Sequence, residues 1–352
     1  KGCAPYFIMV ADIVHGAHSI GAITNTRGSA AGSIVSRILN ISHIDPIYYQ
    51  LPFERFLTVY RPTPPDVDLD ISDNRRDEAI EWITEHYGRD KVAQIITFGT
   101  MMARAAVRDV GRALGVAYGK CDRIAKMIPI GKQGFHMTLE KALDMNHELK
   151  AIYDTDPETK QVLDLAKKLE GCARHASIHA AALAITPTPL TDYAPLQKEP
   201  DGERLITQYD MYALDVGADS HALGVIKMDL LGIRNLSILE EAVRLVQTRH
   251  NINIDIYNLP DGDKKTMKLL GDGLTFGVFQ LGSSGITRYL KELRPQNIFD
   301  IMAMIALYRP GPMGIIPEYI LRRHNSSQIK YFDPRMRDYL ERSLGLLVYQ
   351  DG

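Results

Sequence analysis

The sequence predicts a mixed α/β (α+β) fold in which strands carry the candidate chemistry and helices make up most of the remainder. The stretch Pro65–Ile71 alternates strictly between acidic and apolar residues, which is typical of a half-buried strand. The stretch Gly224–Leu231 sets two charged residues, two positions apart, among apolar ones. Other segments, such as Ala79–Tyr87, repeat apolar residues at the spacing of an amphipathic helix.

The composition is that of an ordinary globular protein. With 352 residues, 45% apolar and 24% charged, the chain can form two or three domains. A formal net charge of −2 means that any surface binding a polyanion must be local. The longest clean apolar run, Ile301–Tyr308, is far shorter than a membrane span, so we expect no membrane partner. The scattered Cys3, Cys121 and Cys172 indicate reduced thiols and a cytoplasmic location. Neither end has the character of a natural terminus, so we expect a piece of a longer protein.

The first third of the chain contains a candidate anion-binding loop. A helix is expected at Tyr6–Val14 and a short strand beginning at Gly21–Ile23. The small residues of Thr26–Ser33 then open a further helix. Backbone N–H groups at a helix N-terminus bind anions, and glycines allow phosphate to approach closely. The Lys-Ser/Thr ending of a P-loop is missing, and the alternative is a turn that serves only to pack the helix.

The acidic stretch is the strongest chemical signal. Period two places Asp66, Asp68 and Asp70 on one face and apolar residues on the other. Three carboxylates together repel one another unless cations are present, and an incomplete cage of oxygens suits Mg²⁺. The alternative is an edge strand whose charges prevent further pairing. Residues two apart can share metals about 4 Å apart, whereas the ends of the row lie about 13 Å apart. Either Asp66 with Asp68 or Asp68 with Asp70 is therefore the ligand pair.

Helix and strand signals continue after the acidic stretch. Ser72 or Asp73 is expected to cap the next helix, and Val92–Thr97 is rich in residues that favour strands. That helix is expected to turn inward its residues Ala79, Ile80, Ile83 and Tyr87. Ser237 begins a capping-box pattern that predicts a helix to about Val246, and the remainder is rich in helix.

A basic segment extends from Arg89 to Lys132. Within it Arg104, Arg108 and Arg112 fall four residues apart, on one face of a helix. Such a stripe suits contacts to a phosphate backbone, and the alternative is a solvated helix face. Asp109 is expected to neighbour the stripe without neutralising it. The histidines of Arg174–His179 lack a third ligand nearby, so a structural or phosphate-facing role is favoured over metal binding.

A distant third aspartate completes the candidate site. Asp229 lies in an apolar strand, where burial is costly unless a cation is present. A Gly-Ser loop, two aspartates two positions apart and a third aspartate on another strand are what two-metal phosphoryl transfer requires. Lys227, two residues before Asp229, can neutralise charge on a phosphate. We therefore expect Asp229 to converge on one metal site with one of the two candidate pairs, Asp66 with Asp68 or Asp68 with Asp70.

Motifs along the whole chain resemble, in order, those of the C-family of bacterial replicative DNA polymerases, the DNA polymerase III alpha family. They are Gly28–Ser33, Phe53–Phe56, Pro65–Asp70, Thr97–Met101, Lys227–Gly232 and Tyr308–Pro312. The resemblance implies a nucleotidyltransferase-like palm sheet, similar to that of X-family polymerases, with an inserted helical thumb and an α-rich fingers segment. The implied ranges are palm 1–97, thumb 98–184, palm 185–234 and the first part of the fingers 235–352.

The resemblance also implies an activity and its residues. Asp66, Asp68 and Asp229 match the catalytic, metal-binding triad of a DNA polymerase that uses two Mg²⁺ ions. The residues that match contacts to the nucleotide triphosphate are Gly28, Ser29, Arg55 and Lys227. The thumb is implied to hold primer-template DNA, and dNTPs are the implied substrates. A sliding clamp and other replicase subunits are implied partners whose binding regions are absent from this chain, and the implied location is the nucleoid.

The chain departs from the family pattern at a few positions. Thr24–Thr26 stands in place of a Gly-Pro-Gly lead, Gly282 in place of Glu, and Ser177 and Ala182 in place of glycines near His179. Because the triad is complete without Asp70, that residue is expected to support the ligands without joining them.

Two other functions remain open. The first is a template-independent nucleotidyltransferase, against which the basic thumb-like and the finger-like segments argue. The second is a non-catalytic DNA-binding fragment, against which the intact Asp66, Asp68 and Asp229 argue.

Overall fold

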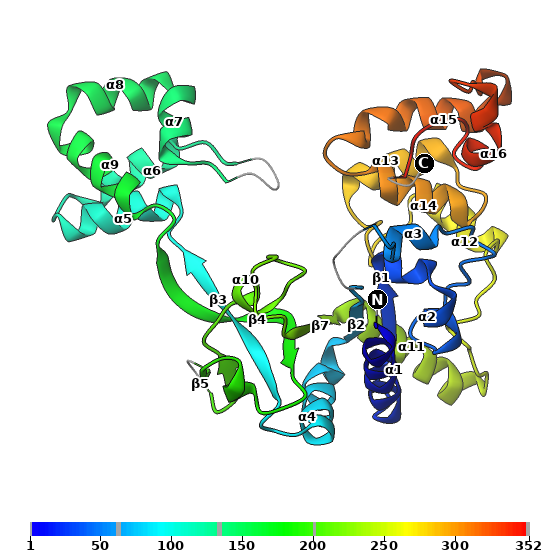
Figure 1. The fold of residues 1–352 in the computed structure, drawn as a ribbon. Coiled ribbons are helices and arrows are strands. Elements are labelled where there is room, and N and C mark those ends of the chain that lie inside the picture. The colour runs from blue at the N-terminus through cyan, green and yellow to red at the C-terminus, as the bar shows by residue number, and fades with distance from the viewer. Residues whose placement is uncertain (1, 61–64, 132–135, 200–201, 350–352) are drawn as a thin grey trace. The chain divides into compact units, whose positions relative to one another are not determined.

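The computed structural model describes residues 2–60, 65–131, 136–199 and 202–349, and the expected mixed α/β fold is confirmed (Figure 1). The chain forms two compact units. The first consists of Lys1–Gly28 and Val59–Gly232, and the second of Ser29–Thr58 and Ile233–Gly352. Within the described ranges, no helix combines the length and the apolar character that crossing a bilayer requires.

The described part of the first unit contains one seven-stranded sheet. Its strands, in spatial order, are β1 (Thr24–Arg27), β2 (Asp68–Ser72), β7 (Ile226–Ile233), β4 (Ala173–Ile185), β3 (Val92–Thr100), β6 (Leu205–Thr207) and β5 (Leu196–Lys198). β1 runs antiparallel to β2 and β4 antiparallel to β7, with Ala182 opposite Asp229. β3 pairs with β6 in parallel, and the other described pairs are antiparallel. The two strands that carry the candidate residues, β2 and β7, are therefore neighbours.

Two helices of the first unit pack against each other. α1 (Ala4–Ser19) contains the helix expected at Tyr6–Val14, and α4 (Arg76–Tyr87) buries Ala79, Ile80 and Ile83 as expected. The expected caps are wrong, because a 3₁₀ turn, η2 (Asp73–Arg75), separates β2 from α4. Ser72 ends β2, and Arg75 rather than Ser72 or Asp73 precedes α4.

Between β3 and β4, the residues that the structure describes form five helices. They are α5 (Ala103–Ala113), α6 (Tyr118–Met127), α7 (Leu139–Met145), α8 (His147–Thr155) and α9 (Pro157–Leu169). We refer to them as the inserted helices. Their core is formed by buried residues that include Val107, Ile124, Leu149 and Leu163. β3 and β4 run side by side toward them (Figure 1), with pairs that continue to Thr100 opposite Ala173. The insertion thus has its own hydrophobic core and is joined to the sheet by a two-stranded ribbon.

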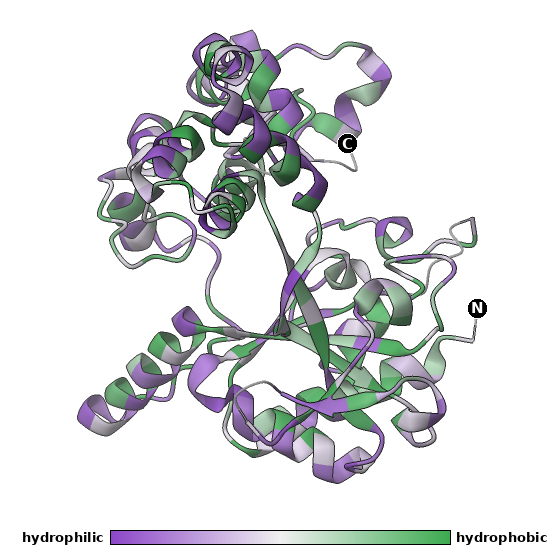
Figure 2. Cartoon of the chain, turned by 90° about the vertical axis from the view of Figure 1, so that its left-hand side faces the viewer, coloured by the Kyte–Doolittle hydropathy of each residue, from purple (hydrophilic) through white to green (hydrophobic). Residues whose placement is uncertain are grey.

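The second unit is helical where it is described. Its longer helices are α11 (Arg234–His250), α12 (Lys264–Gly271), α13 (Ser284–Leu293), α14 (Ile298–Leu307) and α15 (Ile316–His324). Shorter ones are α2 (Ile34–Ile38), α3 (Phe53–Phe56) and α16 (Arg337–Leu340). Polar and apolar residues alternate along the helices of the chain (Figure 2), and the core of this unit includes Leu290, Leu307 and Tyr319. α10 (Met211–Leu214) belongs to the first unit.

Two local expectations need correction here. Ser237 does not cap a helix, because α11 already begins at Arg234 and Ser237 lies inside its first turns. The small-residue loop does open a helix, but the loop itself forms a 3₁₀ turn, η1 (Gly28–Gly32), and α2 is only five residues long. Ser33 caps α2 by accepting a hydrogen bond from the N–H of Ser36 at 3.2 Å.

Candidate active site

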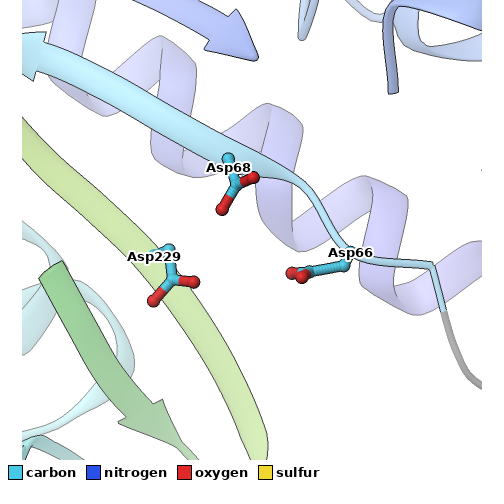
Figure 3. Close-up of side chains that lie close together, drawn as sticks. All are labelled: Asp66, Asp68 and Asp229. Atoms are coloured by element: carbon cyan, nitrogen blue, oxygen red, sulfur yellow. The ribbon is translucent and has the colours of Figure 1, made fainter. Parts of the chain in front are cut away.

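Three carboxylates of the first unit converge, and Figure 3 shows their side chains turned toward one another. Asp68 is the first residue of β2, Asp66 precedes that strand, and Asp229 lies in β7. One oxygen of each lies within 4.8 Å of the others. The expected convergence of Asp66, Asp68 and Asp229 is therefore confirmed as geometry.

Burial of the apolar face fixes the direction of these side chains. Val67 and Leu69 in the first stretch, and Met228 and Leu230 in β7, are fully buried. Because successive side chains of a strand point to opposite faces, the intervening aspartates are directed away from that core. Asp66 is exposed, whereas the other two aspartates are half-buried. The site is thus on a face of the sheet, at two neighbouring strands that both lie inside it.

Asp70 lies outside the cluster and has its own partner. Its side chain is only 4% exposed, and Nε of Arg27 donates a hydrogen bond to its Oδ1 at 2.7 Å. Burial raises the pKa of the Asp70 carboxyl, and the hydrogen bond and charge of Arg27 oppose that rise. Of the two pairs that spacing left open, Asp66 with Asp68 is the one that meets Asp229.

Negative charge in the cluster exceeds the positive charge beside it. Lys227 Nζ contacts Oδ2 of Asp229, and both side chains are largely buried. Burial lowers the pKa of the Lys227 ammonium, but the hydrogen bond and charge of Asp229, with smaller contributions from other carboxylates, raise it overall. Although Asp66 is exposed as a residue, partial loss of hydration at its carboxylate raises its pKa; the charges of Asp68 and Asp229 add to that effect, and Lys227 opposes it. One ammonium therefore faces three carboxylates.

The residues present fit a divalent cation. Oδ1 of Asp229 is buried and has no hydrogen-bond partner. A buried acceptor without a partner costs about 1–3 kcal/mol, and more if it is charged. A hard cation with oxygen ligands, such as Mg²⁺, would satisfy that atom and reduce the repulsion among the three carboxylates. Among the described residues, no other group of three or more aspartate, glutamate, histidine or cysteine side chains lies close enough together to hold a metal ion.

The predicted triphosphate-binding residues are divided between the units. Gly28 is in the first unit and has a positive φ of 74°, and a Cβ built there would lie 3.8 Å from Oδ2 of Asp68. Lys227 contacts Asp229 in the same unit. Ser29 lies in η1 and Arg55 in α3, both in the second unit. The roles of all four stay predictions.

The arginine stripe of α5 is paired within the protein. Nε of Arg104 donates to the carbonyl of Ile128 at 3.1 Å. Arg108 forms an ion pair with Asp122 at 2.9 Å. Arg112 pairs with Asp109 at 2.7 Å, so the expectation that Asp109 leaves the stripe unneutralised is wrong. The helical face is present, but its charges already have partners.

Two residues near the site were missed by sequence reasoning. Tyr6 begins the apolar helix expected at Tyr6–Val14, yet its hydroxyl oxygen accepts a hydrogen bond from the N–H of Val67 at 3.0 Å. Burial raises the pKa of the Tyr6 phenol, and the charges of the three aspartates add to the rise. The other is Arg27, the partner of Asp70. The only sign of this role in the sequence is that Tyr6 brings a hydroxyl group into an otherwise apolar stretch of helix.

His179, in the histidine-containing segment Arg174–His179, has a local role. Nδ1 of His179 accepts hydrogen bonds from the N–H groups of Ala181 and Ala182, at 3.2 and 2.9 Å. These bonds fall where the β3–β4 register shifts. This geometry agrees with the structural role that was favoured over metal binding.

Comparison with known proteins identifies similar sequences along the chain. The profile of the family described as "Bacterial DNA polymerase III alpha NTPase domain" matches residues 1–232. A second, "Bacterial DNA polymerase III alpha subunit finger domain", matches residues 235–352. DNA polymerase III subunit alpha of Thermus aquaticus is 42% identical over 356 residues, which cover 99% of this chain and 28% of that protein. The Bacillus subtilis (strain 168) protein of the same name is 44% identical over 347 residues, 98% of this chain and 30% of that protein. The chain thus spans less than a third of the length of these curated relatives.

Proposed function

The chain belongs to the bacterial DNA polymerase III alpha family, and on that premise we propose that it carries the catalytic part of a template-directed, replicative DNA polymerase. The reaction is transfer of a nucleotide from a dNTP to a primer 3′-hydroxyl, with release of pyrophosphate. The observation that carries the proposal is the group formed by Asp66, Asp68 and Asp229, with a buried, unpartnered oxygen on the last. A group of this kind needs cations, and phosphoryl transfer uses them.

In the proposed site, Asp66, Asp68 and Asp229 hold two Mg²⁺ ions. When bound, such ions activate the attacking hydroxyl and stabilise charge on the leaving oxygen. Lys227 supplies a positive charge to the triphosphate beside Asp229. Gly28 leaves room for phosphate next to Asp68, because no side chain projects there. We assign Ser29 and Arg55 to the same triphosphate by resemblance.

We propose the remaining parts by resemblance to the family. The palm consists of residues 1–97 and 185–234, the thumb of 98–184, and the fingers begin at 235. The thumb binds primer-template DNA, with Arg104, Arg108 and Arg112 as the proposed phosphate contacts. The existence of a separate hydrophobic core in the inserted helices supports a thumb of this kind. In the whole protein, we expect a sliding clamp and other replicase subunits as partners, at the bacterial nucleoid in the cytoplasm.

Primer extension by the full-length protein tests the proposal. We expect Mg²⁺-dependent addition of the nucleotide that the template specifies, and loss of that addition in Asp229→Asn. Addition to a single-stranded primer, with no influence of template, would instead identify a template-independent nucleotidyltransferase. Binding of duplex DNA with no incorporation at any Mg²⁺ concentration would identify a non-catalytic DNA-binding protein. A matched control is Asp154→Asn, which removes an exposed carboxylate of the inserted helices.

A further inference from the structure

The peptide between two of the clustered aspartates is held by a side chain from another element. The N–H of Val67 donates a hydrogen bond to the hydroxyl oxygen of Tyr6 at 3.0 Å. Tyr6 belongs to α1 and lies 61 residues before Val67 in the sequence. Val67 lies between Asp66 and Asp68, and its own side chain is fully buried.

This hydrogen bond holds a peptide that lies before the first pair of the β1–β2 register. The register of β1 with β2 ends at Arg27 opposite Asp68, and β2 itself begins at Asp68. Asp66 therefore precedes the strand, yet its carboxylate lies within 4.8 Å of the other two. The N–H of Val67 belongs to the planar peptide that joins Asp66 to Val67. A hydrogen bond to it restricts the orientation of that peptide and therefore the direction of the Asp66 side chain on the adjacent Cα.

The helix that supplies Tyr6 is a firm support. Phe7, Val10 and Val14 of α1 are buried, and α1 packs against α4 and β1. The ring of Tyr6 also meets that of Phe7 edge to face at 6.2 Å between centroids. The hydroxyl is thus presented from a packed element rather than from a loop.

From this arrangement we propose that Tyr6 is a positioning residue for the metal site. Its hydroxyl holds the Val67 peptide and thereby keeps Asp66 in reach of Asp68 and Asp229. Tyr6 acts through the backbone and touches neither metal nor substrate. The inference rests on the proposed function, because it assumes that the three carboxylates hold a divalent cation.

The test measures metal binding directly. Mn²⁺ is the probe, because it takes the same oxygen ligands as Mg²⁺ and its free ion is counted by electron paramagnetic resonance. Tyr6→Phe in the full-length protein removes the hydroxyl and retains the ring. We expect its Mn²⁺ dissociation constant to rise about tenfold, the lower end of the effect of removing a group that orients a ligand. The Mg²⁺ concentration for half-maximal nucleotide incorporation should rise in parallel, and saturating Mg²⁺ should restore most of the rate.

Tyr87→Phe is the matched control. The hydroxyl of Tyr87 donates to Asp12 at 2.8 Å and joins α4 to α1, away from the three aspartates. This variant also loses a tyrosine hydroxyl, which contacts Asp12 and, at 3.4 Å, the carbonyl of Met9, so its melting temperature should fall at least as much as that of Tyr6→Phe. Its Mn²⁺ affinity should stay at the wild-type value. An equal loss of affinity in both variants would show a general effect of destabilising α1, and would overturn the inference.

A third variant separates this inference from the proposed function. Asp68→Asn should abolish the tight Mn²⁺ binding of the wild type. If it does, and Tyr6→Phe binds Mn²⁺ as the wild type does, the positioning role is wrong while the metal site stands. If Asp68→Asn leaves Mn²⁺ binding unchanged, the metal site is wrong and the role of Tyr6 fails with it.

Discussion

The aspartate cluster and the arginine stripe of α5 were both predicted from regular spacing of like charges, but the fold treats them differently. In the cluster, three carboxylates come within 4.8 Å of one another, with one lysine beside them and one oxygen left without a partner. In the stripe, Arg108 and Arg112 each have an aspartate within 3 Å. A row of like charges in a sequence therefore indicates a ligand only where the fold leaves those charges unbalanced.

The difference has a physical basis. Collecting carboxylates in a partly buried place raises the free energy of the folded chain, and binding a proton or a metal cation there lowers it again. Arginines paired with nearby aspartates create no such demand. Arg112 is 77% exposed and retains N–H donors beyond the one it gives to Asp109, so it can still contact a phosphate. The cluster could hold a metal ion that offsets its charge, whereas the charges of the stripe are already paired and can still accept a phosphate.

The largest expected effect comes from removing charge at the cluster. Asp66→Asn or Asp68→Asn should each lower the single-turnover rate of nucleotide incorporation by about a thousandfold or more, because each loses an ionised ligand of the proposed metals. The measurement is rapid-quench incorporation with Mg²⁺ by the full-length protein. Near-normal rates in either variant would show that the charge of the replaced aspartate is not needed. The contrast with the paired arginines of the stripe would then be lost.

Asp70 allows paired and clustered carboxylates to be compared within one strand, because it pairs with Arg27 whereas Asp68 joins the cluster. Asp70→Asn should cost about tenfold to a hundredfold in the same assay, because Asp70 pairs with Arg27 and supports β2 without joining the cluster. Arg27→Gln removes the other partner and should give a loss of similar size. If Asp70→Asn were as inactive as Asp68→Asn while Asp66→Asn kept near-normal rates, the ligand pair would be Asp68 with Asp70.

The outcome at each place shows what local sequence can and cannot predict. Alternation predicted the buried faces of β2 and β7 because side-chain direction in a strand depends only on neighbouring residues. The residues alone pointed to Asp229 as a third ligand, but only family resemblance chose Asp66 rather than Asp70 as the partner of Asp68. The partners of Tyr6 and Arg108 depend on tertiary packing, since they lie 61 and 14 residues away. The spacing of residues in the sequence did not indicate either partner. The capping pattern at Ser237 likewise did not predict the start of α11, which begins three residues earlier at Arg234.

The loop beside the cluster tests whether its surroundings favour an anion. Gly28→Val places a side chain next to Asp68 and should raise the apparent KM for dNTP about tenfold, as expected when one or two charge-assisted N–H contacts are lost. Affinity for primer-template, measured by fluorescence anisotropy, should hardly change. Gly21→Val is the matched control, because Gly21 also has a positive φ, 82°, but nothing lies within 4 Å of its built Cβ. Weaker DNA binding with an unchanged KM would refute the assignment of this loop to the triphosphate.

The smallest effect is expected at the stripe. Charge reversal of Arg104, Arg108 and Arg112 should weaken binding of duplex DNA and flatten its salt dependence. Each lost phosphate contact lowers the slope of log K against log salt by roughly one. Arg104 and Arg108 also join α5 to Ile128 and Asp122, so the triple variant needs a thermal melt as evidence that the inserted helices remain folded.

A single substitution tests the stripe without that complication. Arg112→Gln breaks only the pair with Asp109, and it should lower the salt slope by about one if Arg112 contacts a phosphate of bound DNA. Lys160→Gln removes the same charge from another surface of the inserted helices, where Lys160 lies 5.8 Å from the ring centroid of Tyr153. Under the proposed assignment this control leaves the slope unchanged. If Lys160→Gln lowers the slope and Arg112→Gln does not, DNA is bound by the lysine surface, and the paired charges of α5 serve only to hold the inserted helices together.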